Sequence, residues 1–207
     1  MQISIHPQAS SHDAAESRFW DDEAADYSRY VLDELNGPRA QAWLSLVESH
    51  FAGKKGLDIL DAGTGPGFFP CILAAAGHKV TGIDSSVAML QRARANVAKR
   101  GLQDCVRLET ADCVNLPFPT GSFDVVVSRN VTWALRDPRR AYAEWQRVLR
   151  PGGLLLVYDA NWHLQFYNKD VERRVRENEE SCADLYGVDM RVCRDDKPYY
   201  DSLPLSN

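Results

Sequence analysis

Three glycines at alternate positions, directly after a short and largely apolar run, limit the possible fold of this chain more than any other feature. The segment Asp61–Gly67 reads D-A-G-T-G-P-G and follows the run Leu57–Leu60. Glycine has no Cβ, so a backbone rich in it can turn sharply after a buried strand and come close to a bound ligand. The segment therefore predicts a strand, a tight ligand-binding turn and a helix.

The spacing of these glycines separates two classes of nucleotide-binding loop. Dinucleotide folds carry G-x-G-x-x-G, whose last glycine lets a helix pack against the strand under the pyrophosphate. Here the glycines follow G-x-G-x-G, and Phe68 stands where the dinucleotide pattern has its last glycine. The chain also has no Tyr-x-x-x-Lys pair. These features argue against an NAD-dependent reductase.

Helix start and stop signals recur along the chain. Predicted helices over Phe68–Ala76 and Ser85–Arg100 are each followed by glycine, the residue that favours the position after a helix. Asp137-Pro138 supplies an N-cap acid and a proline at the first helical position, and predicts a helix to about Leu149. Near the N-terminus, the pattern predicts helices over Asp13–Leu35 and from Pro38 to about Phe51.

Short apolar segments alternate with these helices, as in βαβ units. The first two predicted strands are the run Leu57–Leu60 and a strand that ends in Asp84. The other three are Val106–Leu108, Val125–Val127 and Leu154–Val157. Their nearly continuous apolar character predicts cover on both faces. The chain is therefore expected to form an α/β fold with a doubly wound, mostly parallel sheet that binds ligands at the carboxyl ends of its strands.

An acid, a glycine loop, a helix and a strand that ends in Asp84 follow one another, and this order resembles motif I and the next acidic position of the class I S-adenosylmethionine-dependent methyltransferases, methyltransferase type 11-like. The further matching segments are Val80–Ser86, Glu109–Phe118, Ser122–Asn130 and Arg147–Val157. The resemblance covers about residues 55–160. It implies a Rossmann-like core over 52–160, an N-terminal helical lid segment over 1–51 and an extension over 161–207 of the same domain.

The C-terminal part departs from the family pattern. A complete domain of this family has two more strands after the fifth, yet only Val188–Cys193 reads as a strand, Asp170–Ala183 reads as a charged helix, and 198–207 reads as irregular. We therefore expect edge strands to be missing, and an uncovered sheet edge favours pairing with another chain. A homodimer is one expected solution.

The resemblance implies a binding site for S-adenosylmethionine and its product S-adenosylhomocysteine. Asp61 would orient the methionine end, Asp84 would accept both ribose hydroxyls, and Asp112 with the Cys113 amide would bind adenine. A simple N-cap is the alternative for Asp84, and a solvated loop acid is the alternative for Asp112. The implied cofactor residues are Asp61, Gly63, Thr64, Gly65, Gly67, Asp84, Ser85, Met89, Asp112, Cys113 and Arg129. Met89 or Leu116 would form an apolar wall for adenine, and either is equally well a core residue.

Residues after the fourth and fifth strands are the candidates for the acceptor side. The resemblance places Arg129, Asn130 and Trp133 near the transferred methyl group, with lid packing as the alternative. His163 is the candidate general base because histidine changes charge near neutral pH, although a structural histidine is the more frequent case. Asp159, Asn161 and Trp162 precede it and are also candidates to face the substrate. Trp20, Tyr27 and Tyr30 belong either to a lid or to the core.

Composition narrows the class of protein. The 207 residues, 44% hydrophobic and 26% charged, suit one soluble domain. A net charge of −5 provides no basic field for nucleic acid. Five cysteines without C-x-x-C spacing, and no apolar stretch long enough for a membrane span or signal peptide, indicate a cytoplasmic protein. The sequence has no cluster of His and Cys residues, so we predict no metal site.

The function predicted from these observations is methyl transfer from S-adenosylmethionine to a small-molecule acceptor by in-line displacement. Holding the two reactants in the right geometry supplies much of the rate in such a reaction. The alternative is a non-catalytic, methyltransferase-like binding module.

Overall fold

The computed structural model describes residues 13–160 and 168–186, with side chains for 19–160 and 168–177. Its centre is a five-stranded sheet in the order β3-β2-β1-β4-β5, and every neighbouring pair of strands is parallel. The strands are β1 (Asp58–Ala62), β2 (Lys79–Asp84), β3 (Val106–Thr110), β4 (Phe123–Arg129) and β5 (Leu149–Tyr158). The predicted parallel sheet is therefore confirmed, with β1 at its middle.

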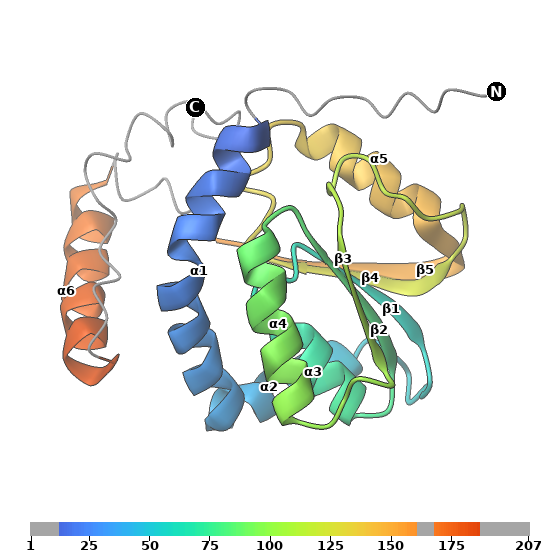
Figure 1. Cartoon of the computed structure of the whole chain (residues 1–207), viewed down its shortest axis with the longest axis horizontal. Coiled ribbons are helices and arrows are strands. Elements are labelled where there is room, and N and C mark those ends of the chain that lie inside the picture. The colour runs from blue at the N-terminus through green and yellow to red at the C-terminus, as the bar shows by residue number, and fades with distance from the viewer. Residues whose placement is uncertain (1–12, 161–167, 187–207) are drawn as a thin grey trace.

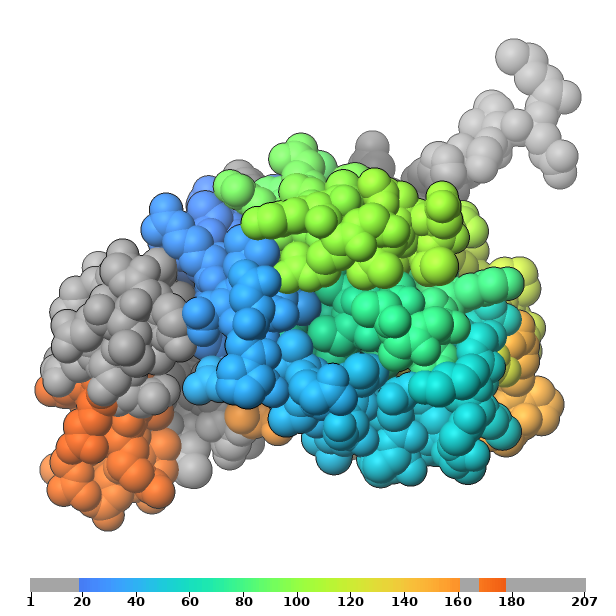
Figure 2. Space-filling view, turned by 90° about the horizontal axis from the view of Figure 1, so that it is seen from below, coloured from blue at the N-terminus to red at the C-terminus, as the bar shows by residue number. Residues whose placement is uncertain are grey.

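Helices cover the two faces of this sheet unequally. On one face lie α1 (Asp13–Asn36), α2 (Pro38–Glu48), α3 (Phe68–Ala75) and α4 (Val87–Lys99), and on the other lies α5 (Pro138–Val148) (Figure 1). Figure 2 shows α1, α2 and α4 joined into one continuous surface from blue to green. From β1 the chain builds the sheet outward to β3 on one side, and then returns to add β4 and β5 on the other side. Sheets of this class bind ligands at such a switch point, here between β1 and β4.

The helix signals in the sequence place the helix ends to within a few residues. Ser86 caps α4 by accepting a hydrogen bond from the Met89 amide at 3.0 Å, and Asp137 caps α5 by accepting one from the Arg140 amide at 3.0 Å. The second helix ends at Glu48 instead of Phe51, because the chain tightens there into turns. Phe51 itself is buried. The predicted helix over 170–183 is present as α6 (Lys169–Tyr186).

The core consists of two layers, one on each face of the sheet. Under α1–α4 it is built around Phe69, Leu73 and the β4 valines Val125 and Val127. Under α5 it is built around Trp145, which is fully buried. α3 lies in the middle of the first layer, and its residues 68–74 are all buried.

The prediction that all strands are covered on both faces is wrong for β3. In the register of the sheet, Thr81 of β2 lies beside Arg107 of β3, and Ile83 lies beside Glu109. Arg107 is exposed and forms an ion pair with Glu109. α5 contacts β5 at the opposite end of the sheet, so this part of the second face meets water and carries polar residues.

Within the described residues the sheet ends at β5, and no helix is both long and apolar enough to cross a membrane. The predictions for residues 1–12, Val188–Cys193 and 198–207 lie outside the described ranges.

Candidate functional site

The glycine loop after β1 is fixed to the end of β2. The amides of Gly63 and Thr64 both donate to the Ile83 carbonyl, at 3.0 and 2.8 Å. Gly63 has φ 75°, in the left-handed region that favours glycine, and a Cβ there would lie 2.3 Å from a methyl group of Val131. The loop and the segment after β4 are therefore in direct contact, and only glycine allows this approach.

Asp84 at the end of β2 lies against the same loop. Its Oδ2 accepts a hydrogen bond from the Gly65 amide at 2.8 Å, and its Oδ1 accepts one from the Ser86 amide at 2.9 Å. A carboxylate has about four acceptor positions, so this arrangement leaves capacity for a pair of hydroxyls. The N-cap of α4 is Ser86 and not Asp84, which weakens the purely structural alternative for Asp84.

Asp61 is buried one residue before the end of β1. Its side chain accepts a hydrogen bond from the Thr64 hydroxyl at 2.6 Å, and the residue is only 2% exposed. Burial raises the pKa of Asp61 to about 7, while the Thr64 hydrogen bond opposes the rise and the charge of Asp84 adds to it. Burial likewise raises the pKa of Asp84 to about 6, against the lowering effect of the Ser86 and Gly65 amides.

These two carboxylates and the open glycine loop fit S-adenosylmethionine in chemical terms. Burial outweighs the groups that favour their charged forms, which for Asp61 include the charge of Arg129, and neither acid forms an ion pair among the described residues. A ligand that carries an ammonium group, a sulfonium and a ribose diol supplies both positive charge and hydroxyl donors. The two acceptor carboxylates therefore suit the cofactor that the resemblance implies.

The N-terminal helix α1 crosses the glycine loop and the start of α4. Asp21 accepts hydrogen bonds from the Ser86 hydroxyl at 2.5 Å and the Ala88 amide at 3.2 Å. A Cβ on Gly65 would lie 3.6 Å from the ring of Tyr27. Trp20 meets Trp133 edge to face, with the ring centroids 6.1 Å apart. Of the three N-terminal aromatics, Trp20 and Tyr27 lie at the site, and Tyr30 stacks on Tyr27 in the first core layer.

Arg129 has a different environment from the one expected. Its guanidinium forms an ion pair with Glu34 of α1 at 2.6 Å, and these side chains are only 11% and 3% exposed. The same group lies over the rings of Trp43 and Phe68, 4.7 and 4.5 Å from their centroids. This placement favours a structural role for Arg129, as a link between α1 and the sheet, over the catalytic and cofactor-binding roles that we expected.

The segment after β4 is held by Asp159. The Asp159 carboxylate accepts hydrogen bonds from the amides of Thr132 and Trp133, at 2.7 and 3.3 Å, and from the Thr132 hydroxyl. Trp133 is 8% exposed, and its indole donates to the Asn130 carbonyl at 3.0 Å. Asp159 therefore positions Trp133 and its neighbours. Asn161, Trp162 and the candidate base His163 lie outside the described residues.

The segment predicted to receive adenine follows β3. The Ala111 amide donates to the Asp84 carbonyl at 3.1 Å, and Asp112, which is exposed, accepts from the Val114 amide at 2.9 Å. Cys113 and Leu116 are buried in the second core layer, which favours the core alternative for the Leu116 side chain. Met89 is also buried, at the start of α4, while Ser85 is exposed at the end of β2.

Sequence reasoning missed several polar residues that support the site. Asn96 of α4 is 5% exposed and donates to the Pro66 carbonyl in the glycine loop at 2.9 Å. The detectable signal was its position, because Asn96 lies at helical spacing from the buried Met89 and Ala93. The same spacing applies to Asp21 and Glu34, which lie three residues from the buried Ala24 and Val31, although both otherwise resemble the surface acids around them in α1.

Comparison with known proteins agrees with this geometry. A family model described as a methyltransferase domain matches residues 60–157. Sterol 24-C-methyltransferases of Gibberella zeae and Pneumocystis carinii are 33% and 29% identical over 66% and 64% of this chain. The chain spans only 37% and 36% of the length of those two proteins.

Solved structures show the same fold. A SAM-dependent methyltransferase from Aquifex aeolicus aligns with a TM-score of 0.52 and 28% identity, over 56% of this chain and 63% of that chain. The glycine loop, the acid at the end of β2, the sheet order and these matches agree. Residues 60–157 therefore form a methyltransferase domain of the class I, S-adenosylmethionine-dependent type.

Proposed function

We propose that this protein transfers a methyl group from S-adenosylmethionine to a small-molecule acceptor. The observation that carries the proposal is the pair of acids, Asp61 and Asp84, that are hydrogen-bonded to the glycine loop and form no ion pair among the described residues. Asp84 would hold the ribose hydroxyls, Asp61 would orient the amino acid end, and Asp112 with the Cys113 amide would bind adenine. When bound, S-adenosylmethionine supplies an electrophilic methyl group on its sulfonium.

The residues around this site act mainly by orientation. In-line displacement requires the acceptor atom to lie close to the methyl carbon and opposite the sulfur, and holding that geometry supplies several kcal/mol of the barrier. Asp159 fixes the segment of Trp133, and Glu34 with Arg129 fixes α1 above the sheet. His163 remains the candidate base of the proposal. A methyl group accepted by a neutral hydroxyl or carbon would need such a base, whereas one accepted by a thiolate would not.

Aromatic side chains support an acceptor with an apolar surface. The rings of Phe19 and Trp20 meet edge to face with their centroids 5.1 Å apart. The Trp20 ring also contacts the rings of Tyr27 and Trp133. Such rings favour flat or apolar ligands and also attract a sulfonium through their π faces. The relatives named sterol 24-C-methyltransferases act, by name, on acceptors of that character. A sterol-like or other apolar small molecule is therefore the acceptor class that we propose.

Two measurements test this function. The purified protein is titrated with S-adenosylhomocysteine in a calorimeter, with NADH as the control ligand, and micromolar binding of the first alone is expected. Labelled S-adenosylmethionine is then incubated with the protein and a panel of sterols and other apolar acceptors. Labelled product supports the enzyme. Binding with no transfer across a broad panel would favour the non-catalytic module instead.

A further inference from the structure

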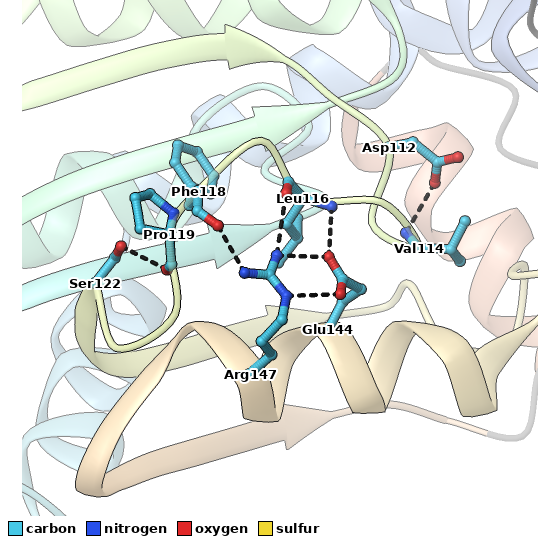
Figure 3. A network of polar contacts seen from close by, with 8 residues as sticks. All are labelled: Asp112, Val114, Leu116, Phe118, Pro119, Ser122, Glu144 and Arg147. Atoms are coloured by element: carbon cyan, nitrogen blue, oxygen red, sulfur yellow. Dashed lines mark hydrogen bonds and ion pairs between the residues drawn. The ribbon is translucent and has the colours of Figure 1, made fainter. Parts of the chain in front are cut away.

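An ion pair on α5 reaches the segment between β3 and β4. Arg147 donates to both carboxylate oxygens of Glu144, from Nε at 2.8 Å and from Nη2 at 2.7 Å. Figure 3 shows both side chains directed from the helix toward the segment of Leu116 and Phe118. Two parallel bonds fix the plane of the guanidinium relative to the carboxylate. The pair is thus a rigid unit with donors and an acceptor to spare.

The other hydrogen bonds of this pair all go to the main chain of one segment. Glu144 accepts from the Leu116 amide at 2.9 Å, while Arg147 donates to the carbonyls of Leu116 at 3.1 Å and Phe118 at 2.7 Å (Figure 3). Three main-chain groups within three residues are therefore satisfied by two side chains of another element. Removing either side chain leaves main-chain groups of the segment without their partners.

The segment fixed in this way carries the residues expected to read the adenine base. At its start, the Ala111 amide is bonded to Asp84, which lies at the ribose position of the proposed site. Between the two anchors the chain closes a turn, in which the Asn115 amide donates to the Asp112 carbonyl at 3.2 Å and the Val114 amide donates to the Asp112 side chain. Asp112 and Cys113 thus lie in a segment that is hydrogen-bonded to β2 at one end and to α5 at the other.

We propose that the Glu144–Arg147 pair sets the base specificity of the cofactor site by holding residues 112–118 in a single conformation. This inference rests on the proposed function, because it takes Asp112 and Cys113 as the adenine-reading groups. Neither Glu144 nor Arg147 contacts the ligand in this account. They are positioning residues, and they act through the main chain of the segment.

A general stabilising role is the competing explanation, and the chain offers a matched control. Arg150 of β5 likewise makes two contacts with carboxylate oxygens, although these belong to two residues, Asp58 at 2.9 Å and Asp124 at 2.8 Å. Both acids lie at the amino ends of their strands, and the cofactor site lies at the carboxyl ends. The substitutions Arg147→Met and Arg150→Met therefore each remove a guanidinium with two carboxylate contacts, but only the first touches the adenine segment.

The test compares two ligands that differ only in the base. S-adenosylhomocysteine has an amino group at purine position 6 and an acceptor at N1, whereas S-inosylhomocysteine has a carbonyl oxygen at position 6 and a hydrogen on N1. Their dissociation constants are measured by calorimetry for the wild type, Arg147→Met, Glu144→Gln and Arg150→Met. The wild type should prefer the adenosyl ligand by about tenfold or more, the size expected for hydrogen bonds to a charged acceptor. Arg147→Met should bring the ratio close to one, mainly by weakening the adenosyl ligand.

The ratio separates positioning from general stability, since both ligands would suffer equally from a less stable protein. Arg150→Met should keep the wild-type ratio even if its melting temperature falls. Glu144→Gln keeps the shape of the side chain and provides a second reading if Arg147→Met does not fold. An unchanged ratio in the folded variants, or a wild type that does not discriminate, would overturn the inference alone. A wild type that binds neither ligand would overturn the proposed function as well.

Discussion

Both ends of the sheet carry buried or half-buried acids, but the pKa values of these acids shift in opposite directions at the two ends. At the amino ends, Asp124 is paired with Arg150, and although its burial acts to raise the pKa, that hydrogen bond brings the pKa below its ordinary value. At the carboxyl ends, the pKa values of Asp61 and Asp84 are raised to about 7 and about 6. Acids of the first kind stabilise the fold. Acids of the second kind cost stability and are explained by a ligand that restores the missing partner.

The largest expected effect is on cofactor binding when the unpaired acid at the ribose position is removed. Asp84→Ala removes the proposed acceptor of two hydroxyl groups, each worth roughly 1.5–3 kcal/mol when the acceptor is charged. We expect the affinity for S-adenosylhomocysteine to fall about a thousandfold by calorimetry. Asp124→Ala, at the paired end, is the control and should lower the melting temperature with little change in affinity. Similar losses of affinity in the two variants would remove the distinction between the two ends of the sheet.

A second prediction concerns the buried ion pair of Glu34 and Arg129, which links α1 to the sheet. Glu34→Gln leaves the Arg129 guanidinium buried without its counter-charge, and such losses cost about 3 kcal/mol of unfolding free energy. Urea unfolding monitored by tryptophan fluorescence measures this cost. Exchanging both residues, as Glu34→Leu with Arg129→Met, should recover most of it, because no unpaired charge then remains. Failure of the double variant to recover stability would show that Arg129 has another charge-dependent partner.

A third prediction follows from the raised pKa of Asp61. Its pKa in the folded protein, about 7, lies above the ordinary value of 3.8, so the folded state binds a proton more tightly than the unfolded state does. The resulting stability is fully present below about pH 4 and is lost as pH rises through 7, by at most about 1.4 kcal/mol per pH unit. Unfolding of the ligand-free protein at pH 5, 6, 7 and 8 should show this decline. Asp61→Asn should make the decline shallower, and nearly flat above pH 6, where Asp84 no longer contributes.

The paired end supplies the opposite case in the same experiment. Because the pKa of Asp124 is lowered, its contribution is present above the ordinary pKa and is lost only as pH falls further. Asp124→Asn should therefore reduce stability by the same amount at every pH from 5 to 8. A slope for Asp61→Asn equal to that of the wild type would mean that Asp61 is ionised throughout this range.

The smallest expected effect concerns the support of the glycine loop. Asn96→Ala removes the donor to the Pro66 carbonyl and should lower the unfolding free energy by about 1 kcal/mol. Gln91→Ala, on the exposed face of the same helix, is the control and should have almost no effect. The affinity for S-adenosylhomocysteine should weaken only in Asn96→Ala. Equal behaviour of the two variants would show that the loop holds its shape without Asn96.

The fold could be predicted from the sequence because its signals are local. Glycine after a strand, a cap before a helix and alternating apolar segments each act within a few residues, and together they fixed the order of strands and helices. The positions of Asp61, Asp84 and the glycines at the carboxyl edge followed from the same rules. The cover of β3 did not, because it depends on where α5 packs, far along the chain.

Side-chain partners could not be predicted because they join distant parts of the chain. Arg129 finds Glu34 95 residues earlier, and Asp21 finds Ser86 65 residues later. Glu144 and Arg147 look in sequence like an ordinary pair on a helix surface, three residues apart. Only the packing of α5 shows that they hold the segment of Leu116. The predicted homodimer stays a prediction, which the solution mass of the protein tests.

Proton release on ligand binding tests the central claim most directly. S-adenosylhomocysteine is titrated into the wild type at pH 6.5 in two buffers of different ionisation enthalpy, and again at pH 8.5. If Asp61 and Asp84 are partly protonated in the ligand-free protein at pH 6.5, binding should release protons at that pH and almost none at pH 8.5. Binding without proton release at either pH, or no binding at all, would contradict the claim that these two acids form the cofactor site.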